Sequence, residues 1–144
     1  MRSLLIIVLL SFSFGIAEEN WKTNFDDAKK EAAANEKIIL LSFSGSDWCS
    51  NCIRLEKTLF ESDEFSVFAK EHLVLLKADF PMRKANKLSK DQQQHNDALA
   101  EKYNKKGKFP AVFLLNEKGE VLGQMGHPYE TPSEYIANIK TLIP

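Results

Sequence analysis

Two cysteines separated by two residues, placed where an apolar run gives way to a helical pattern, constrain the fold of this chain more than any other feature. The run is Ile38–Ser44, and the element Trp48-Cys49-Ser50-Asn51-Cys52 follows it after a short turn. A nearly continuous apolar run of this length is typical of a strand that is buried on both faces. The 144 residues contain only 2 cysteines, so at most one internal disulfide can form and the fold must depend on its hydrophobic core.

The rest of the chain alternates between strand-like and helix-like segments, which predicts a single α/β domain. Strands are expected at Ile38–Ser44, His72–Phe80, Ala111–Leu115 and Val121–Met125. Helices are expected at Trp21–Ala34, at Cys49–Lys70 with an interruption at Glu61-Ser62-Asp63, at Asn96–Tyr103, and at Thr131–Leu142 with Ser133 as a candidate cap. The order predicts a mixed four-stranded sheet with helices on both faces: two parallel strands joined by a helical crossover, then an antiparallel hairpin.

One polar and basic stretch interrupts this pattern between the second and third strands. It runs over Pro81–Gln94 and carries Arg83, Lys84, Lys87 and Lys90. We expect a loop or an insertion here that turns helical near Ser89.

The first residues have the pattern of a secretory signal peptide. A single positive charge at Arg2 precedes an apolar segment, Leu4–Ala17, that ends in small residues. The alternative is an uncleaved membrane anchor, but this segment has 14 residues, against roughly 20 for a spanning helix. We therefore expect a signal peptide over residues 1–17, a mature domain over 18–144, and a periplasmic or secreted location in which disulfides persist.

Charge and composition exclude several classes of protein. The chain has 19 basic and 20 acidic residues, a formal net charge of −1, and 44% hydrophobic residues. This composition argues against a disordered chain. A nearly neutral chain argues against a nucleic-acid partner.

The cysteine pair indicates redox chemistry. A sulfur at the start of a helix lies near free backbone N–H groups, which stabilise its thiolate and lower its pKa. Cys49 is thus suited to attack a substrate disulfide, and Cys52, three residues on, to resolve the mixed disulfide. Three other interpretations remain open: half of a zinc site, a Cu(I) site, or a structural local disulfide. The three histidines, His72, His95 and His127, form no paired ligand motif, and no metal site is predicted.

A strand, a Cys-x-x-Cys element and a helix in sequence, together with Phe109-Pro110 after a glycine-containing loop, resemble the thioredoxin superfamily. The similarity covers Lys37–Pro144 and extends to secreted bacterial thioredoxin-like proteins and to the C-terminal domain of the disulfide reductase DsbD. The resemblance implies a thioredoxin-like fold, with Cys49 as nucleophile and Cys52 as resolving cysteine. It also implies that Trp48 flanks the site and that Pro110 is a cis-proline. Phe109, which precedes Pro110, departs from the family pattern, and we expect its bulky apolar side chain to narrow substrate access.

Glu56 is a further candidate, since it lies four residues after Cys52 on the same helix face. A carboxylate there could accept or return the Cys52 proton, and the DsbD domain has an acidic residue at the matching place. The alternative is a solvated helix glutamate. Thioredoxins carry a buried aspartate six residues before the nucleophile, where this chain has Phe43. The absence of that carboxylate favours Glu56 or water as the proton acceptor.

The sequence thus predicts an exported thiol–disulfide oxidoreductase that reduces or isomerises disulfides of other extracytoplasmic proteins. The central pair Ser50-Asn51 lacks a histidine, and Asp47 adds negative charge nearby, which argues against a strongly oxidising site. We expect no cofactor, a membrane protein as electron donor, and a monomer. The alternatives are a thioredoxin-fold binding module with a non-catalytic disulfide, or a copper-handling protein, for which Met82, Met125 and His127 are scattered candidates.

Overall fold

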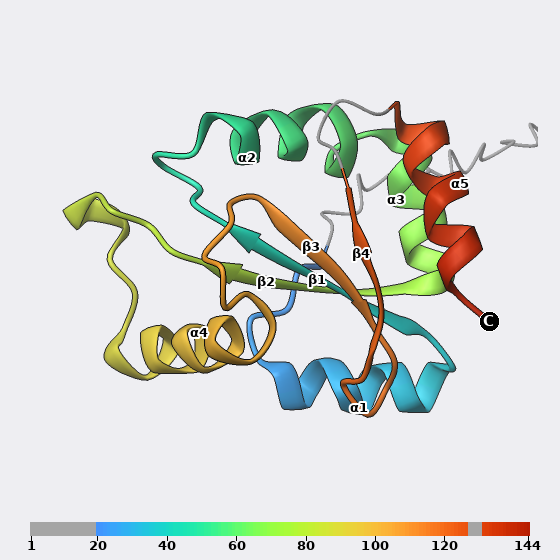
Figure 1. Cartoon of the computed structure of the whole chain (residues 1–144), viewed down its shortest axis with the longest axis horizontal. Helices are drawn as coiled ribbons and strands as arrows, with labels where there is room; N and C mark the ends of the chain where they lie inside the picture. Colours follow the sequence, from blue (N-terminus) through green and yellow to red (C-terminus); the bar gives the residue numbers. More distant parts are fainter. Residues whose placement is uncertain (1–19, 127–130) are drawn as a thin grey trace, which may run out of the picture.

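A central sheet separates two layers of helices in the computed structural model, which describes residues 20–126 and 131–144 (Figure 1). Its strands are β1 (Ile38–Ser44), β2 (Leu73–Asp79), β3 (Ala111–Leu115) and β4 (Val121–Met125), in the order β2-β1-β3-β4. Strand β1 pairs parallel with β2 and antiparallel with β3, and β3 pairs antiparallel with β4. The predicted mixed sheet, with a parallel pair followed by a hairpin, is confirmed.

Each face of the sheet carries its own hydrophobic core. Helices α2 (Ser50–Leu55), α3 (Asp63–His72) and α5 (Pro132–Leu142) cover one face, and α1 (Phe25–Asn35) and α4 (Lys90–Tyr103) cover the other (Figure 1). Alternate residues of β1 point to opposite faces: Leu40 packs in the α2–α3–α5 core, whereas Leu41 packs in the α1–α4 core. Both faces of β1 are therefore covered, which explains its continuous apolar sequence.

Two helices begin at other residues than the hydrophobic pattern predicts, because polar caps set their starts. Helix α1 begins at Phe25, since the side chain of Asn24 accepts a hydrogen bond from the Asp27 N–H. Trp21 lies outside this helix, and its neighbour Lys22 forms a parallel bridge to β2. Helix α4 begins six residues before the expected Asn96 because Ser89 caps it. The expectation that the insertion turns helical near Ser89 is thus confirmed, whereas the predicted helix Asn96–Tyr103 was six residues too short at its start.

The helical region after the cysteines is divided as expected. Helix α2 continues into the wider turn η1 (Glu56–Phe60), and α3 then starts afresh with Ser62 as its cap. At the other end of the chain, Thr131 caps α5 and forms a capping box with Glu134, so the expectation that Ser133 is the cap was wrong. The insertion after β2 holds one short helical turn, η2 (Lys84–Asn86).

The predicted signal peptide, residues 1–17, lies outside the described residues, as does His127. Within the described part of the chain, every helix is too short or too polar to cross a membrane.

Candidate active site

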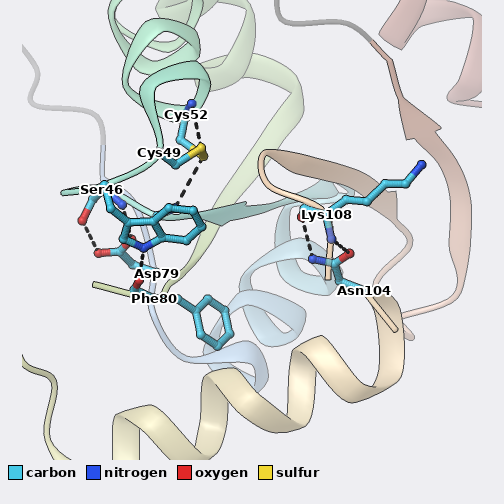
Figure 2. The surroundings of a disulfide bond; sticks show 9 residues. Ser46, Cys49, Cys52, Asp79, Phe80, Asn104 and Lys108 are labelled. Carbon is cyan, nitrogen blue, oxygen red and sulfur yellow. Dashed lines mark hydrogen bonds between the residues drawn. A yellow bond between two sulfur atoms is a disulfide. The ribbon is translucent and has the colours of Figure 1, made fainter. Parts of the chain in front are cut away.

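The two cysteines form a disulfide at the point where β1 leads into α2 (Figure 2). Their Cα atoms lie 5.2 Å apart, and the residues are only 7% and 4% exposed. The Cys49 sulfur accepts a hydrogen bond from the Cys52 N–H at 3.2 Å, and the Cys52 sulfur accepts one from the Gly45 N–H at 3.5 Å. A backbone donor therefore points at each sulfur, which favours the charged thiolate once the pair is reduced.

Aromatic side chains flank the disulfide. The indole N–H of Trp48 donates to the Phe80 carbonyl at 2.7 Å. The ring of Phe109 makes edge contacts with both Trp48 and Phe80, with centroids 5.4 Å and 5.5 Å apart. The Phe109–Pro110 peptide bond is cis, as expected. Trp48 remains 44% exposed, so one side of this aromatic group is available to a substrate.

Gly45 makes room for the tryptophan. A Cβ atom at this position would collide with the indole of Trp48. The same glycine donates its N–H to the Cys52 sulfur. Its lack of a side chain makes room for Trp48, and its backbone N–H contacts the disulfide.

The segment that contains the two cysteines, residues 45–52, is called the cysteine turn here. Its carboxylate, Asp47, binds the insertion that follows β2, residues 81–94. Asp47 accepts hydrogen bonds at 2.9 Å from the Met82 N–H, the Arg83 N–H and the Asn86 side chain. The Met82 N–H, followed by the Asn86 amide, lowers the pKa of Asp47 below its usual value of 3.8. The negative charge that the sequence places near Cys49 is therefore engaged by donors of the insertion.

A second carboxylate, at the end of β2, binds the cysteine turn in return. Asp79, the last residue of β2, accepts hydrogen bonds from the backbone N–H of Ser46 at 2.9 Å and from its hydroxyl at 2.5 Å. The Asp79 carbonyl accepts from the side chain of the buried Asn96 at 2.8 Å. The cysteine turn, the end of β2 and helix α4 are thus linked by hydrogen bonds. Figure 2 shows Ser46 and Asp79 beside the disulfide.

Glu56 lies in a pocket with Cys52. The cavity has a volume of about 280 Å³, and Ser44, Cys52, Glu56, Glu61 and Lys77 are among the residues that line it. The ammonium of Lys77 contacts both carboxylate oxygens of Glu56, at 2.8 Å and 2.9 Å. Sequence reasoning identified Glu56 but missed Lys77. A signal was present, because Lys77 interrupts the apolar run at the start of the strand sequence LVLLKAD.

Comparison with known proteins identifies the family. The model of the thioredoxin-like family matches residues 20–117. The chain belongs to the thioredoxin-like family. A relative in Chlamydia pneumoniae, the disulfide bond reductase DsbH, is 31% identical over 127 residues, which are 88% of this chain and 74% of that protein.

Solved structures agree with the family assignment. The structure of a DsbH oxidoreductase superposes with a TM-score of 0.80 at 31% identity, over 88% of this chain and 85% of that one. The oxidised C-terminal domain of Neisseria meningitidis DsbD shares the fold, with a TM-score of 0.55 at 21% identity over 83% and 90% of the two chains. With its Cys-x-x-Cys disulfide, this thioredoxin-like protein is a thiol–disulfide oxidoreductase.

The thioredoxin-like fold also corrects the comparison made at Phe43. The Phe43 side chain is fully buried in the core under α1 and α4, where it packs against Phe113. The neighbouring Ser44 lines the pocket that contains Cys52. Counting six residues back from Cys49 therefore selects a residue that points to the other face of the sheet. The β1 residue on the Cys52 side is a serine, so the carboxylate in that pocket comes from η1.

The histidines have separate places in this thioredoxin-like protein. His95 accepts a hydrogen bond from the Phe25 N–H at 3.0 Å, and His72 packs against Phe68 at the end of α3. Within residues 20–126 and 131–144, no group of three or more His, Cys, Asp or Glu is arranged to hold a metal ion.

Proposed function

We propose that this protein is an exported oxidoreductase that reduces or isomerises disulfides of other extracytoplasmic proteins. The observation that carries the proposal is the Cys49–Cys52 disulfide beside Phe109–Pro110 and an exposed Trp48. The name of its relative, the disulfide bond reductase DsbH, supports the reductive direction. The signal-peptide pattern over residues 1–17 supports export.

Catalysis begins from the reduced pair. The Cys49 thiolate attacks one sulfur of the substrate disulfide, and the other substrate sulfur leaves as a thiolate that takes up a proton. The Cys52 thiolate then attacks the Cys49 sulfur and releases the second substrate thiol. The substrate gains two electrons and two protons, and the protein returns to the disulfide form of the structure. A membrane dithiol protein supplies the electrons for the next cycle.

The resolving step needs a base, because Cys52 must lose its proton before it attacks. Glu56 lines the same pocket as Cys52 and is held there by Lys77. We assign the acceptance of the Cys52 proton to this carboxylate. The Gly45 N–H, which already points at the Cys52 sulfur, stabilises the thiolate that results.

The substrate chain lies against the Phe109–Pro110 segment. Pro110 has no N–H, and the N–H and carbonyl of Phe109 form no backbone hydrogen bond within the described part of the chain. An extended peptide can therefore pair with Phe109. Trp48 and the Phe109 ring, which touch each other, contact the apolar side chains of such a peptide.

Trapping of mixed disulfides tests this proposal. The variant C52S should accumulate mixed disulfides with exported proteins, because the first step proceeds and the second cannot. C49S should accumulate none. Equal trapping by both variants would contradict the assigned roles. If neither traps and the pair in residues 18–144 does not titrate in a thiol buffer, the protein is a binding module.

The direction of electron flow follows from the reduction potential of the same pair. A value near that of thioredoxin, about −270 mV, is expected for a reductase. A value near about −120 mV would make the protein an oxidant and would contradict the reductive direction.

A further inference from the structure

A pocket lined by lysines adjoins the segment that leads into Phe109–Pro110. It has a volume of about 250 Å³ and lies at the C-terminal end of α4, against strands β3 and β4. Its lining includes Lys102, Lys105, Lys106, Lys108, Phe113 and Gln124. The walls thus present ammonium groups and an amide around an aromatic surface.

The lysines of this pocket are not paired with acids. Residues 102–116 contain 4 lysines, and the nearest acids in the sequence are Glu101 and Glu117 at either end of this stretch. In the part of the chain that the structure describes, no carboxylate forms an ion pair with any of these lysines. Because the whole protein carries a net charge of only −1, this is a local concentration of positive charge. Like charges repel, so an anionic ligand would relieve their repulsion.

The loop that presents the lysines is held in place. The buried side chain of Asn104 donates to the Lys108 carbonyl at 2.8 Å and accepts from the Lys108 N–H at 3.1 Å. Gly107 has a positive φ of 59°, which lets the loop turn tightly. A loop that is already ordered loses little conformational entropy when it binds a ligand.

The pocket lies close to the path of a substrate. Lys108 precedes the Phe109–Pro110 segment directly. In Figure 2, Asn104 and Lys108 lie to one side of the disulfide, and Ser46 and Asp79 lie to the other. A peptide that pairs with the Phe109 backbone would therefore lie next to Lys108.

We propose that this pocket binds an acidic segment of the protein whose disulfide reacts with Cys49. The proposal rests on the proposed function, and it adds a substrate preference to it. Aspartate or glutamate residues a few positions from the substrate cysteine contact the ammonium groups of Lys105, Lys106 and Lys108. Charge complementarity of this kind acts mainly on the association rate and weakens as salt is added.

Single-turnover kinetics with paired peptides test the preference. Each peptide carries one cysteine as a mixed disulfide with a small thiol, and the residues near the cysteine are aspartates in one peptide and serines in the other. The pre-reduced protein is mixed with each, and the second-order rate constants are compared. At low salt the acidic peptide should react about tenfold faster, and the advantage should shrink as sodium chloride is added.

Matched charge reversals locate the effect. The variant K105E/K106E should remove the preference for the acidic peptide, and K105Q/K106Q should reduce it. The control K30E/K70E makes the same change in net charge at two exposed lysines on α1 and α3, and it should keep the preference. An equal loss in the control would assign the preference to net charge and would overturn the proposal. Equal rates for the two peptides with the unmodified protein would overturn it as well.

Binding without chemistry separates this proposal from the proposed function. A fluorescent acidic peptide that lacks cysteine should bind the oxidised protein more tightly than its serine counterpart, as measured by anisotropy. If neither disulfide peptide is reduced, the proposed function fails, yet this measurement still decides whether the pocket binds acidic chains. Displacement of the peptide by inorganic phosphate at matched ionic strength would assign the pocket to a small anion and overturn the proposal.

Discussion

The ammonium of Lys77 bridges both carboxylate oxygens of Glu56, at 2.8 Å and 2.9 Å, and so joins strand β2 to the first residue of η1. Both side chains are partly exposed, at 22% for Lys77 and 29% for Glu56, so water can reach the pair. The same ammonium lies 4.5 Å from the centre of the Trp21 ring. The carboxylate beside Cys52 is thus held by a cation that is itself positioned by an aromatic side chain.

Replacement of Glu56 should slow resolution and spare the first attack. In E56Q the mixed disulfide with a model peptide should persist on the order of 100-fold longer, because the Cys52 proton has lost its acceptor. The lifetime is measured by quenching with acid and separating the species. K77M should change the lifetime in the same direction but less, since Glu56 remains.

Glu61 provides the control for this measurement. It lines the same pocket as Glu56 but forms no ion pair with Lys77. E61Q should therefore leave the lifetime unchanged. An E56Q protein whose disulfide exchange keeps the pH profile of the unmodified protein would contradict the role given to this carboxylate.

The bonds made by Asp47 predict a pH-dependent contribution to stability. Hydrogen bonds from Met82 and Asn86 lower the pKa of Asp47 in the folded protein. The stabilisation is therefore complete above the pKa of the unfolded chain, about 3.9, and is lost as the pH falls through the lower folded value. D47N should lower the Tm at neutral pH, and the difference from the unmodified protein should shrink in strong acid.

A suitable comparison for D47N is D97N. Asp97 accepts one side-chain hydrogen bond from Gln93 on an exposed face of α4. Its replacement should change the Tm little at any pH. A D47N protein with the Tm of the unmodified protein at neutral pH would show that the contacts to the insertion do not stabilise the fold.

Gly45 should not tolerate even a methyl group. In G45A the new Cβ meets the indole of Trp48, so the ring must move and its hydrogen bond to Phe80 must break. We expect a red-shifted Trp48 emission, recorded in a W21F background, and slower reduction of insulin. G126A is the control, because nothing lies within 4 Å of a Cβ placed there. An unchanged spectrum in G45A would mean that Trp48 is not packed on Gly45 in solution.

Asn104 should stabilise the loop before Phe109. In N104A the Lys108 carbonyl loses its donor and the Lys108 N–H loses its acceptor. Because these polar groups lose their partner, the free energy of unfolding should fall by about 1–3 kcal/mol. Urea denaturation measures the change. N104D keeps the acceptor and should be intermediate. If N104A unfolds at the same urea concentration as the unmodified protein, the loop does not depend on these bonds.

The sequence predicted the sheet well because apolar periodicity and turn residues are local signals. Strands β1, β3 and β4 have the predicted bounds, since a turn or a break flanks each apolar run. The starts of α1 and α4 were missed because several polar residues precede each helix, and only the fold shows that Asn24 and Ser89 bond to the helix.

The site was predicted in part, for a related reason. The Cys-x-x-Cys element and the Phe109-Pro110 pair are each formed by residues that are close together in the sequence, so each motif can be recognised directly. Lys77 in strand β2 reaches Glu56 in η1, 21 residues away in sequence, and such a contact leaves no periodic pattern. The comparison with the thioredoxin aspartate selected Phe43, although Ser44 is the residue that lines the pocket with Cys52. Counting along a chain does not show which face of a strand a residue occupies.

The reciprocal carboxylates beside the disulfide have a consequence for chimeric proteins. Asp47 of the cysteine turn binds the insertion, and Asp79 at the end of β2, just before the insertion, binds Ser46 of the turn. Transplanting residues 45–52 alone into another scaffold would leave Asp47 without its donors and Ser46 without its acceptor. The cysteine turn and the segment 79–86 behave as one cassette, and a graft that keeps the reactivity of the pair has to carry both.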